Sequence, residues 1–172
     1  MRKKFNILMF ILILGMLAFA PSDLIFAKEY EVKEADQYKY VEYEDGVWIV
    51  GYLFDADNNQ SWIIPDKLDG KNVIGIGELN ECYERFYNTW QAKEITLPNT
   101  LKYIGEGAFE HYSIEKILLP DTVEYIGYNA FAGSELKNIT LSNKLTSIGG
   151  YAFCNCTKLE SISFPASLEV IG

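Results

Sequence analysis

Residues 95–116 read ITLPNTLKYIGEGAFEHYSIEK, and this pattern returns as ILLPDTVEYIGYNAFAGSELKN over residues 117–138 and as ITLSNKLTSIGGYAFCNCTKLES over residues 139–161. A partial fourth copy, ISFPASLEVIG, covers residues 162–172. Units that recur at a fixed period of about 20–50 residues can bury their apolar side chains only against neighbouring units. The stretch therefore predicts a solenoid in which each copy forms one coil and successive coils stack.

Each copy begins with a triplet in which two apolar residues flank an outward-facing one, as in Ile95-Thr96-Leu97. Alternation with a period of two is typical of a β-strand that buries one face. Proline follows the triplet in three of the four copies and ends the strand, because it fixes φ and lacks an N–H donor. The outward positions form a row along the stack, which is a candidate binding surface: Thr96, Leu118, Thr140 and Ser163.

The second half of each copy carries another apolar pair, Leu101 and Ile104 in the first copy, followed in every copy by glycine. These glycines indicate either a positive φ or a close approach that a Cβ would prevent. An Ala-Phe pair comes next, which we expect in a short helical turn with the phenylalanines stacked along the array.

A second outward row passes beside this apolar pair and consists of Tyr103, Tyr125, Ser147 and Val170. Two adjacent tyrosines suit an interface, since each supplies contact area at a low entropic cost. Tyr103 and Tyr125 are therefore candidate binding residues, and packing between coils is the alternative for both.

The combined pattern is I-x-[LI]-P-x-[ST]-[VL]-x-x-I-G-x-x-A-F-x-x-C. Residues 95–109 and 117–131 follow it as far as the Ala-Phe pair, and residues 139–156 follow it to the cysteine, with Ser142 and Lys144 as departures. This pattern resembles the BspA-type leucine-rich repeats of bacterial surface and secreted proteins. The resemblance implies a right-handed, horseshoe-like leucine-rich repeat solenoid that is mainly β with short helical turns. It also implies export, and binding or adhesion to proteins or cell surfaces.

Upstream of the repeats, residues 28–77 begin as a charged arm and continue as a β-hairpin cap, with strands expected from Tyr38 to Tyr43 and from Val47 to Phe54. A degenerate first coil ends at residue 77, and residues 78–94 are expected to form an irregular insert. The spacing of acidic and amide residues over 55–59 resembles the start of a calcium loop. The rest of that motif is missing, so a hairpin turn is the better interpretation and no metal site is expected.

The N-terminus has basic residues before an apolar run from Phe5 to Phe19, which is typical of a secretory signal with cleavage after Ala27. An uncleaved anchor stays open. We expect a signal peptide over residues 1–27 and a protein that is secreted or attached to the cell surface, with no membrane contact after cleavage. The formal net charge of −9 disfavours nucleic acid as a partner.

Residues for catalysis are scarce. The sequence has three cysteines (Cys82, Cys154 and Cys156) and one histidine, His111. Cys154 and Cys156 are too close for an unstrained disulfide, and Cys82 falls several coils away from them, so we expect three free thiols. His111 takes a variable corner position. The sequence therefore predicts no enzyme, no cofactor and no metal.

We expect a protein-binding or adhesion module whose partner is a protein or a host or cell-surface ligand. The alternative is a structural spacer, or the repeat portion of a larger exported protein whose effector or enzymatic domain lies beyond Gly172. Because an array normally needs a polar terminal cap, we also expect further sequence after Gly172, or self-association through the apolar edge formed by residues 162–171.

Overall fold

The computed structural model describes residues 31–52, 61–78 and 92–172. The predicted signal peptide, the candidate calcium turn over 55–59, Cys82 and most of the predicted insert lie outside the described residues. All regular structure within the described ranges is β, and none of it is helical. A search of these ranges for a helix able to cross a membrane finds none.

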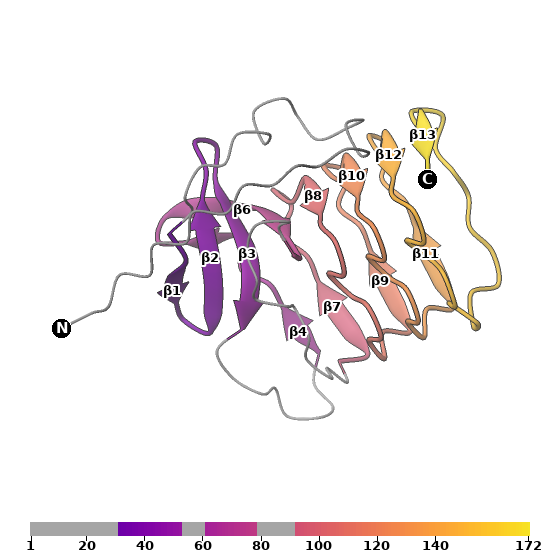
Figure 1. Cartoon of the computed structure of the whole chain (residues 1–172), viewed down its shortest axis with the longest axis horizontal. Coiled ribbons are helices and arrows are strands. Elements are labelled where there is room, and N and C mark those ends of the chain that lie inside the picture. The colour runs from indigo at the N-terminus through magenta and orange to yellow at the C-terminus, as the bar shows by residue number, and fades with distance from the viewer. Residues whose placement is uncertain (1–30, 53–60, 79–91) are drawn as a thin grey trace, which may run out of the picture.

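The strands form two sheets (Figure 1). The long sheet contains, in spatial order, β1 (Lys33–Ala35), β2 (Tyr38–Glu42), β3 (Val47–Tyr52), β6 (Lys71–Ile76), β8 (Tyr103–Ile104), β10 (Tyr125–Ile126), β12 (Ser147–Ile148) and β13 (Val170–Ile171). The short sheet contains β4 (Trp62–Ile63), β7 (Glu94–Thr96), β9 (Lys116–Leu118) and β11 (Asn138–Thr140). A further strand, β5 (Lys67–Leu68), forms a hairpin with β6.

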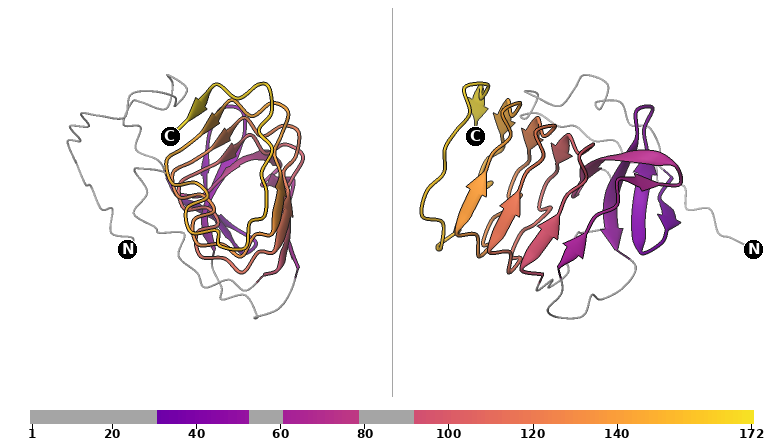
Figure 2. Two further views of the ribbon diagram at one scale, coloured as in Figure 1. Left: turned by 90° about the vertical axis from the view of Figure 1, so that its right-hand side faces the viewer. Right: turned by 180° about the vertical axis from the view of Figure 1, so that it is seen from behind.

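Each full repeat places one strand in each sheet, and strands from successive repeats pair in parallel and in register. In the short sheet Ile117 lies opposite Ile95 and Ile139, and in the long sheet Ile126 lies opposite Ile104 and Ile148. Figure 2 shows the coils one behind another when viewed along the stack. The repeats therefore stack as coils with a common register.

The predicted hairpin is present as the antiparallel pair β2 and β3. It joins the array directly, because β3 pairs in parallel with β6 and β6 pairs in parallel with β8. Within the predicted charged arm, β1 is paired with β2 at the edge of the same sheet. The predicted insert extends by one residue into β7, since that strand starts at Glu94.

The core lies between the sheets and is lined by the inward apolar positions of every coil. Phe131 is fully buried, and its ring stacks on Phe109 with a centroid distance of 5.3 Å and on Phe153 with one of 5.4 Å. The predicted phenylalanine stack is thereby confirmed.

The prediction of short helical turns around the Ala-Phe pairs is wrong. The segment forms hydrogen-bonded turns without a helix. The Phe109 N–H donates to the Ala130 carbonyl at 2.7 Å, and the Phe131 N–H donates to the Ala152 carbonyl at 2.8 Å. Because these donors bond to the next coil, they are not available for the i−4 bonds of an α-helix.

The repeated glycines allow a close approach between coils. A Cβ on Gly127 would lie 2.7 Å from the carbonyl carbon of Gly105, and one on Gly149 would lie 2.7 Å from that of Gly127. Positive φ values occur two residues after the glycines, with φ of 58° at Gly107, 53° at Asn129 and 57° at Tyr151. The glycine that follows the apolar pair in each copy, which we call the glycine column, was expected to allow either a positive φ or a close approach between coils. The close approach is what the structure shows.

Hydroxyl groups add a hydrogen bond between coils at the turn after the proline. The Thr122 hydroxyl donates to the Leu101 carbonyl at 2.7 Å, and the Ser167 hydroxyl donates to the Leu145 carbonyl at 2.7 Å. The third repeat has Lys144 at the equivalent position, so it cannot make the same bond.

Candidate functional site

The outer face of the short sheet carries a continuous row of exposed side chains. Each of its three longest strands buries only the central residue of three, so the last residue of each points to solvent. Ile63 lies opposite Thr96 in register and extends the row by one strand. Leu118 is 69% exposed and Ile63 is 67% exposed. We call this set the outer row: Ile63, Thr96, Leu118, Thr140 and Ser163.

Sequence reasoning placed the four later members of the outer row and missed Ile63. The signal was present, because Trp62-Ile63-Ile64-Pro65 has the same order of apolar residues and proline as Ile95-Thr96-Leu97-Pro98. The observed register pairs Trp62 with Ile95, which confirms that the two segments are equivalent.

A polar row runs beside the outer row, two residues earlier on the same strands. Glu94 lies opposite Lys116, and Lys116 lies opposite Asn138. All three side chains are exposed, and a β-bridge between Asn138 and Ser161 extends the row. The short sheet therefore presents hydroxyl, amide, charged and aliphatic groups together on one face.

Ion pairs between adjacent coils border this face. The Lys137 ammonium lies 2.6 Å from a Glu115 carboxylate oxygen, and Lys158 lies 2.9 Å from Glu135. The hydrogen bond from Lys137 lowers the pKa of Glu115, and the same bond raises the pKa of Lys137. These pairs neutralise one another, so the border adds little net charge to the face.

The tyrosine row of the long sheet is in a different environment. Tyr103 is half-buried and stacks on Trp48 with a centroid distance of 5.6 Å and an interplanar angle of 15°. Burial, and then the carboxylate of Glu124, raise the pKa of Tyr103, while burial followed by Glu106 raises that of Tyr125. Tyr103 therefore fits the alternative that it packs within the molecule, because its ring contacts the cap residue Trp48.

Trp48 fixes this contact between cap and repeats. It is 6% exposed, and its indole N–H donates to the Gly77 carbonyl at 3.0 Å. A Cβ on Gly75 would lie 2.2 Å from the indole ring. The remaining members of the tyrosine row are a buried Ser147 and a half-buried Val170.

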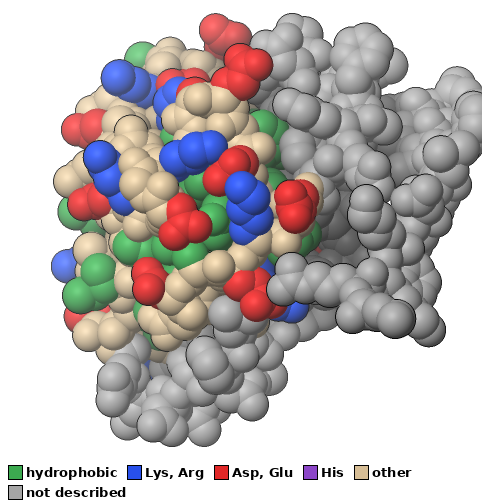
Figure 3. Space-filling model, turned by 90° about the vertical axis from the view of Figure 1, so that its left-hand side faces the viewer, with side chains coloured by type: hydrophobic (Ala, Val, Ile, Leu, Met, Phe, Trp, Pro, Cys, Tyr) green, Lys and Arg blue, Asp and Glu red, His purple; other side chains and the backbone are tan. Residues whose placement is uncertain are grey.

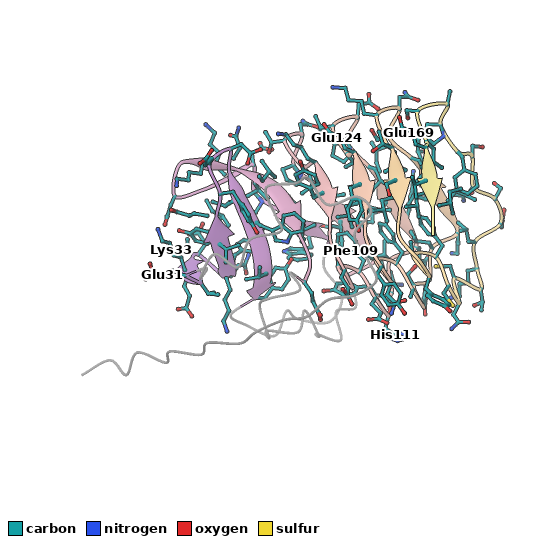
Figure 4. The ribbon with its side chains drawn as sticks, turned by 45° about the horizontal axis from the view of Figure 1, so that its top comes forward. Glu31, Lys33, Phe109, His111, Glu124 and Glu169 are labelled. Carbon is teal, nitrogen blue, oxygen red and sulfur yellow. The ribbon has the colours of Figure 1, made fainter. Side chains whose placement is uncertain are left out.

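His111 lies at a corner of its coil, on a different edge from Glu124 and Glu169 (Figure 4). Its side chain is exposed, as predicted, and its Nε2 atom is 3.9 Å from Glu110.

The only cysteines in the described ranges, Cys154 and Cys156, are free thiols. The Cys156 thiol donates to the Phe131 carbonyl at 3.1 Å, which supports a structural role. Within the described residues no group of three or more His, Cys, Asp or Glu could hold a metal.

The N-terminal end of the molecule intersperses charged and apolar side chains (Figure 3). A polar hollow of about 540 Å³ lies here, lined by Glu31, Val32, Lys33, Glu34, Tyr40 and Asp69. The Tyr40 hydroxyl donates to Asp69 at 2.5 Å, and burial together with this carboxylate raises the pKa of Tyr40 to about 12. Lys33 pairs with Glu42 at 3.0 Å, so several of these groups already have partners.

The last coil differs from the coils before it in its apolar exposure. Phe164 is 51% exposed and Ile171 is 60% exposed, whereas Leu141 and Ile148, one coil earlier, are 7% and 3% exposed.

Stacked parallel strands with this repeat define a leucine-rich repeat protein. The sequence profile described as "BspA type Leucine rich repeat region" matches residues 82–172 in six copies. The chain therefore belongs to the family of BspA-type leucine-rich repeat proteins.

Solved structures agree with this assignment. A leucine-rich repeat protein from Bacteroides capillosus is 26% identical, with a TM-score of 0.52, and the alignment covers 82% of this chain and 87% of that one. One from Bacteroides ovatus is 25% identical, with a TM-score of 0.52 and coverages of 79% and 42%. The pneumococcal vaccine antigen PcpA shares the fold at 22% identity and a TM-score of 0.63, with coverages of 82% and 40%.

This chain thus spans less than half of two of those proteins. A comparison with curated proteins finds no match.

Proposed function

We propose that the chain is a protein-binding module of a secreted or cell-surface bacterial protein, and that it binds through the outer row of the short sheet. The proposal includes the right-handed winding of the coils and the removal of residues 1–27 during export. The observation that carries it is the exposure of about two thirds of two aliphatic residues, Leu118 (69%) and Ile63 (67%), on an otherwise polar sheet face.

Exposed aliphatic groups in a regular row are suited to contact with another protein. Isolated apolar residues on a surface need no explanation, but Leu118 and Ile63 are separated by only one strand, or about 10 Å in total, and share a face with Thr96. A few well-packed residues near the centre of an interface contribute most of the binding energy, and the contacts around them exclude water. The outer row with its polar neighbour has that composition.

The family and the solved structures support this proposal in outline. One protein with the same fold is the pneumococcal antigen PcpA. In a repeat array, equivalent outward positions form extended recognition surfaces, which is how such folds generally bind proteins. A structural spacer is the competing function, and it would have no use for exposed Leu118 and Ile63.

A direct test is binding to immobilised, purified extracellular-matrix proteins and to cultured host cells, by wild type and by the double variant Ile63→Ala/Leu118→Ala. We expect the double variant to bind at least about tenfold more weakly, since truncation of apolar hot spots costs about 1–2 kcal/mol or more. Tyr151→Asn is the matched control, because Tyr151 is 64% exposed elsewhere and Asn accepts its positive φ, as Asn129 does. Wild-type binding by the double variant would place the binding surface away from the outer row, and no binding by any form would favour the spacer.

A further inference from the structure

Lys116 is the exposed cation at the centre of the short sheet's outer face. It lies between Glu94 and Asn138 in the register of the sheet. Two other lysines lie on the border of the face and form ion pairs, Lys137 with Glu115 and Lys158 with Glu135. Among the described residues, no carboxylate oxygen lies within 4 Å of the Lys116 ammonium. Its charge is therefore available to a partner.

Leu118 lies two residues further along the same strand and points to the same side of the sheet. Side chains at this spacing are about 7 Å apart. A partner that contacts Leu118 therefore comes within reach of the flexible Lys116 side chain, which places an exposed cation and an exposed aliphatic group in one patch.

Glu94 makes the patch directional. It faces outward on β7, one strand before Lys116, at a strand spacing of about 4.8 Å. A carboxylate on the partner is attracted on the β9 side and repelled on the β7 side. On the other side of Lys116, Asn138 is neutral and neither attracts nor repels a charged group of the partner strongly. Complementary and repulsive charges of this kind determine orientation and exclude wrong partners more than they add affinity.

We propose that this patch recognises a polypeptide segment that presents a carboxylate to Lys116 beside an apolar side chain that contacts Leu118, with Glu94 setting the orientation of the segment. This inference rests on the proposed function, because it specifies the partner chemistry of the same face. Polyanions such as nucleic acid do not fit, since the chain has a net charge of −9 and Glu94 lies next to the cation.

The experiment is selection of a phage-displayed library of random peptides on the immobilised full chain. Wild type is expected to enrich peptides with an acidic residue next to an aliphatic or aromatic one. Lys116→Glu is expected to bind these peptides about tenfold or more weakly than wild type does. In its own selection it is expected to enrich peptides with a basic residue where the wild-type peptides have the acidic one. Lys144→Glu, a change of equal charge at another exposed lysine, is expected to stay within about twofold of wild type.

The exchange Glu94→Lys/Lys116→Glu sharpens the test, because it keeps the net charge and reverses only the order of the two charges. We expect it to reject the wild-type peptides and to select a different set. A thermal unfolding curve checks that each variant is folded, and Lys116→Gln supplies a milder change with the same expected direction.

The outcomes separate this inference from the proposed function. Peptides that depend on Leu118 but bind Lys116→Glu and the charge exchange as they bind wild type would overturn the carboxylate inference and leave the binding face in place. Peptides insensitive to both Leu118→Ala and Lys116→Glu, or no enrichment at all, would overturn both.

Discussion

The two sheets are built by the same repeats, yet their outer faces differ. The short sheet exposes Leu118 and Ile63 to solvent, whereas the long sheet holds Trp48 and Ser147 buried and Tyr103 half-buried. The repeat thus supplies two outward rows of equal regularity, and their side chains differ in how much of their surface reaches solvent. Position within a repeat shows which way a side chain points, but at Tyr103 the ring of Trp48 from the cap covers that direction.

The largest contrast is expected between Trp48→Ala and Leu118→Ala. Trp48 is buried and hydrogen-bonded at the junction of cap and repeats, so its truncation should cost about 3–5 kcal/mol of unfolding free energy. Leu118 is exposed, and its truncation should change stability by no more than about 0.5 kcal/mol. Chemical denaturation of both variants checks this pair. Equal losses would show that the short sheet's face is also structural.

The glycine column offers the next contrast. On Gly127 a Cβ would lie 2.7 Å from backbone atoms of the preceding coil, so Gly127→Ala should cost about 1–3 kcal/mol. At Gly150 the nearest atom, in the Tyr128 ring, would be 3.5 Å away, an ordinary contact. Gly150→Ala is therefore the control and should change stability little. A similar midpoint of denaturation for the two variants would refute the close approach between coils.

These elements show what the sequence could predict. The inward and outward positions of the short sheet followed from period-two alternation in triplets such as Ile95-Thr96-Leu97. Strands β8, β10, β12 and β13 were not predicted, because two residues each are too few to show alternation. They form where the repeats extend a sheet that begins in the cap, and that pairing is not local.

The helical turns were wrongly predicted for a related reason. An Ala-Phe pair after glycine favours a compact turn, but the choice between a helix and a single hydrogen-bonded turn depends on where the N–H groups find acceptors. For Phe109 and Phe131 those acceptors are in the next coil. The positive φ at Asn129 and Gly107 had a sequence signal, since both residue types tolerate that conformation, while Tyr151 at the same position gave none.

A smaller effect is expected at the turn after the proline position, where the chain passes from the short sheet to the long sheet. Thr122→Val removes the bond to the Leu101 carbonyl and should cost about 1 kcal/mol. Lys144→Thr should gain about as much, because it restores the missing hydroxyl bond between coils. Thermal unfolding of both variants is the measurement. Destabilisation by Lys144→Thr would show that the lysine has another role there.

The smallest effect concerns Glu106, beside the tyrosine row. Burial, and then the carboxylates of Glu78 and Glu110, raise the pKa of Glu106 above its usual value. The folded state therefore holds this proton to a higher pH than the unfolded state, so its ionisation lowers stability as pH rises through that range. Glu106→Gln should raise the melting temperature near about pH 7 and lose that advantage near about pH 4, below the usual glutamate pKa. The same shift at both pH values would contradict this assignment.

The central claim is that the short sheet's outer row binds while the long sheet's outer face supports the fold. Its most direct test is the affinity of Leu118→Ala and Tyr125→Ala for a selected ligand, measured beside their stability. We predict that Leu118→Ala keeps wild-type stability and binds at least about tenfold more weakly. Tyr125→Ala should be less stable and, where folded, bind as wild type does. Lost binding in Tyr125→Ala with unchanged binding in Leu118→Ala would contradict the account.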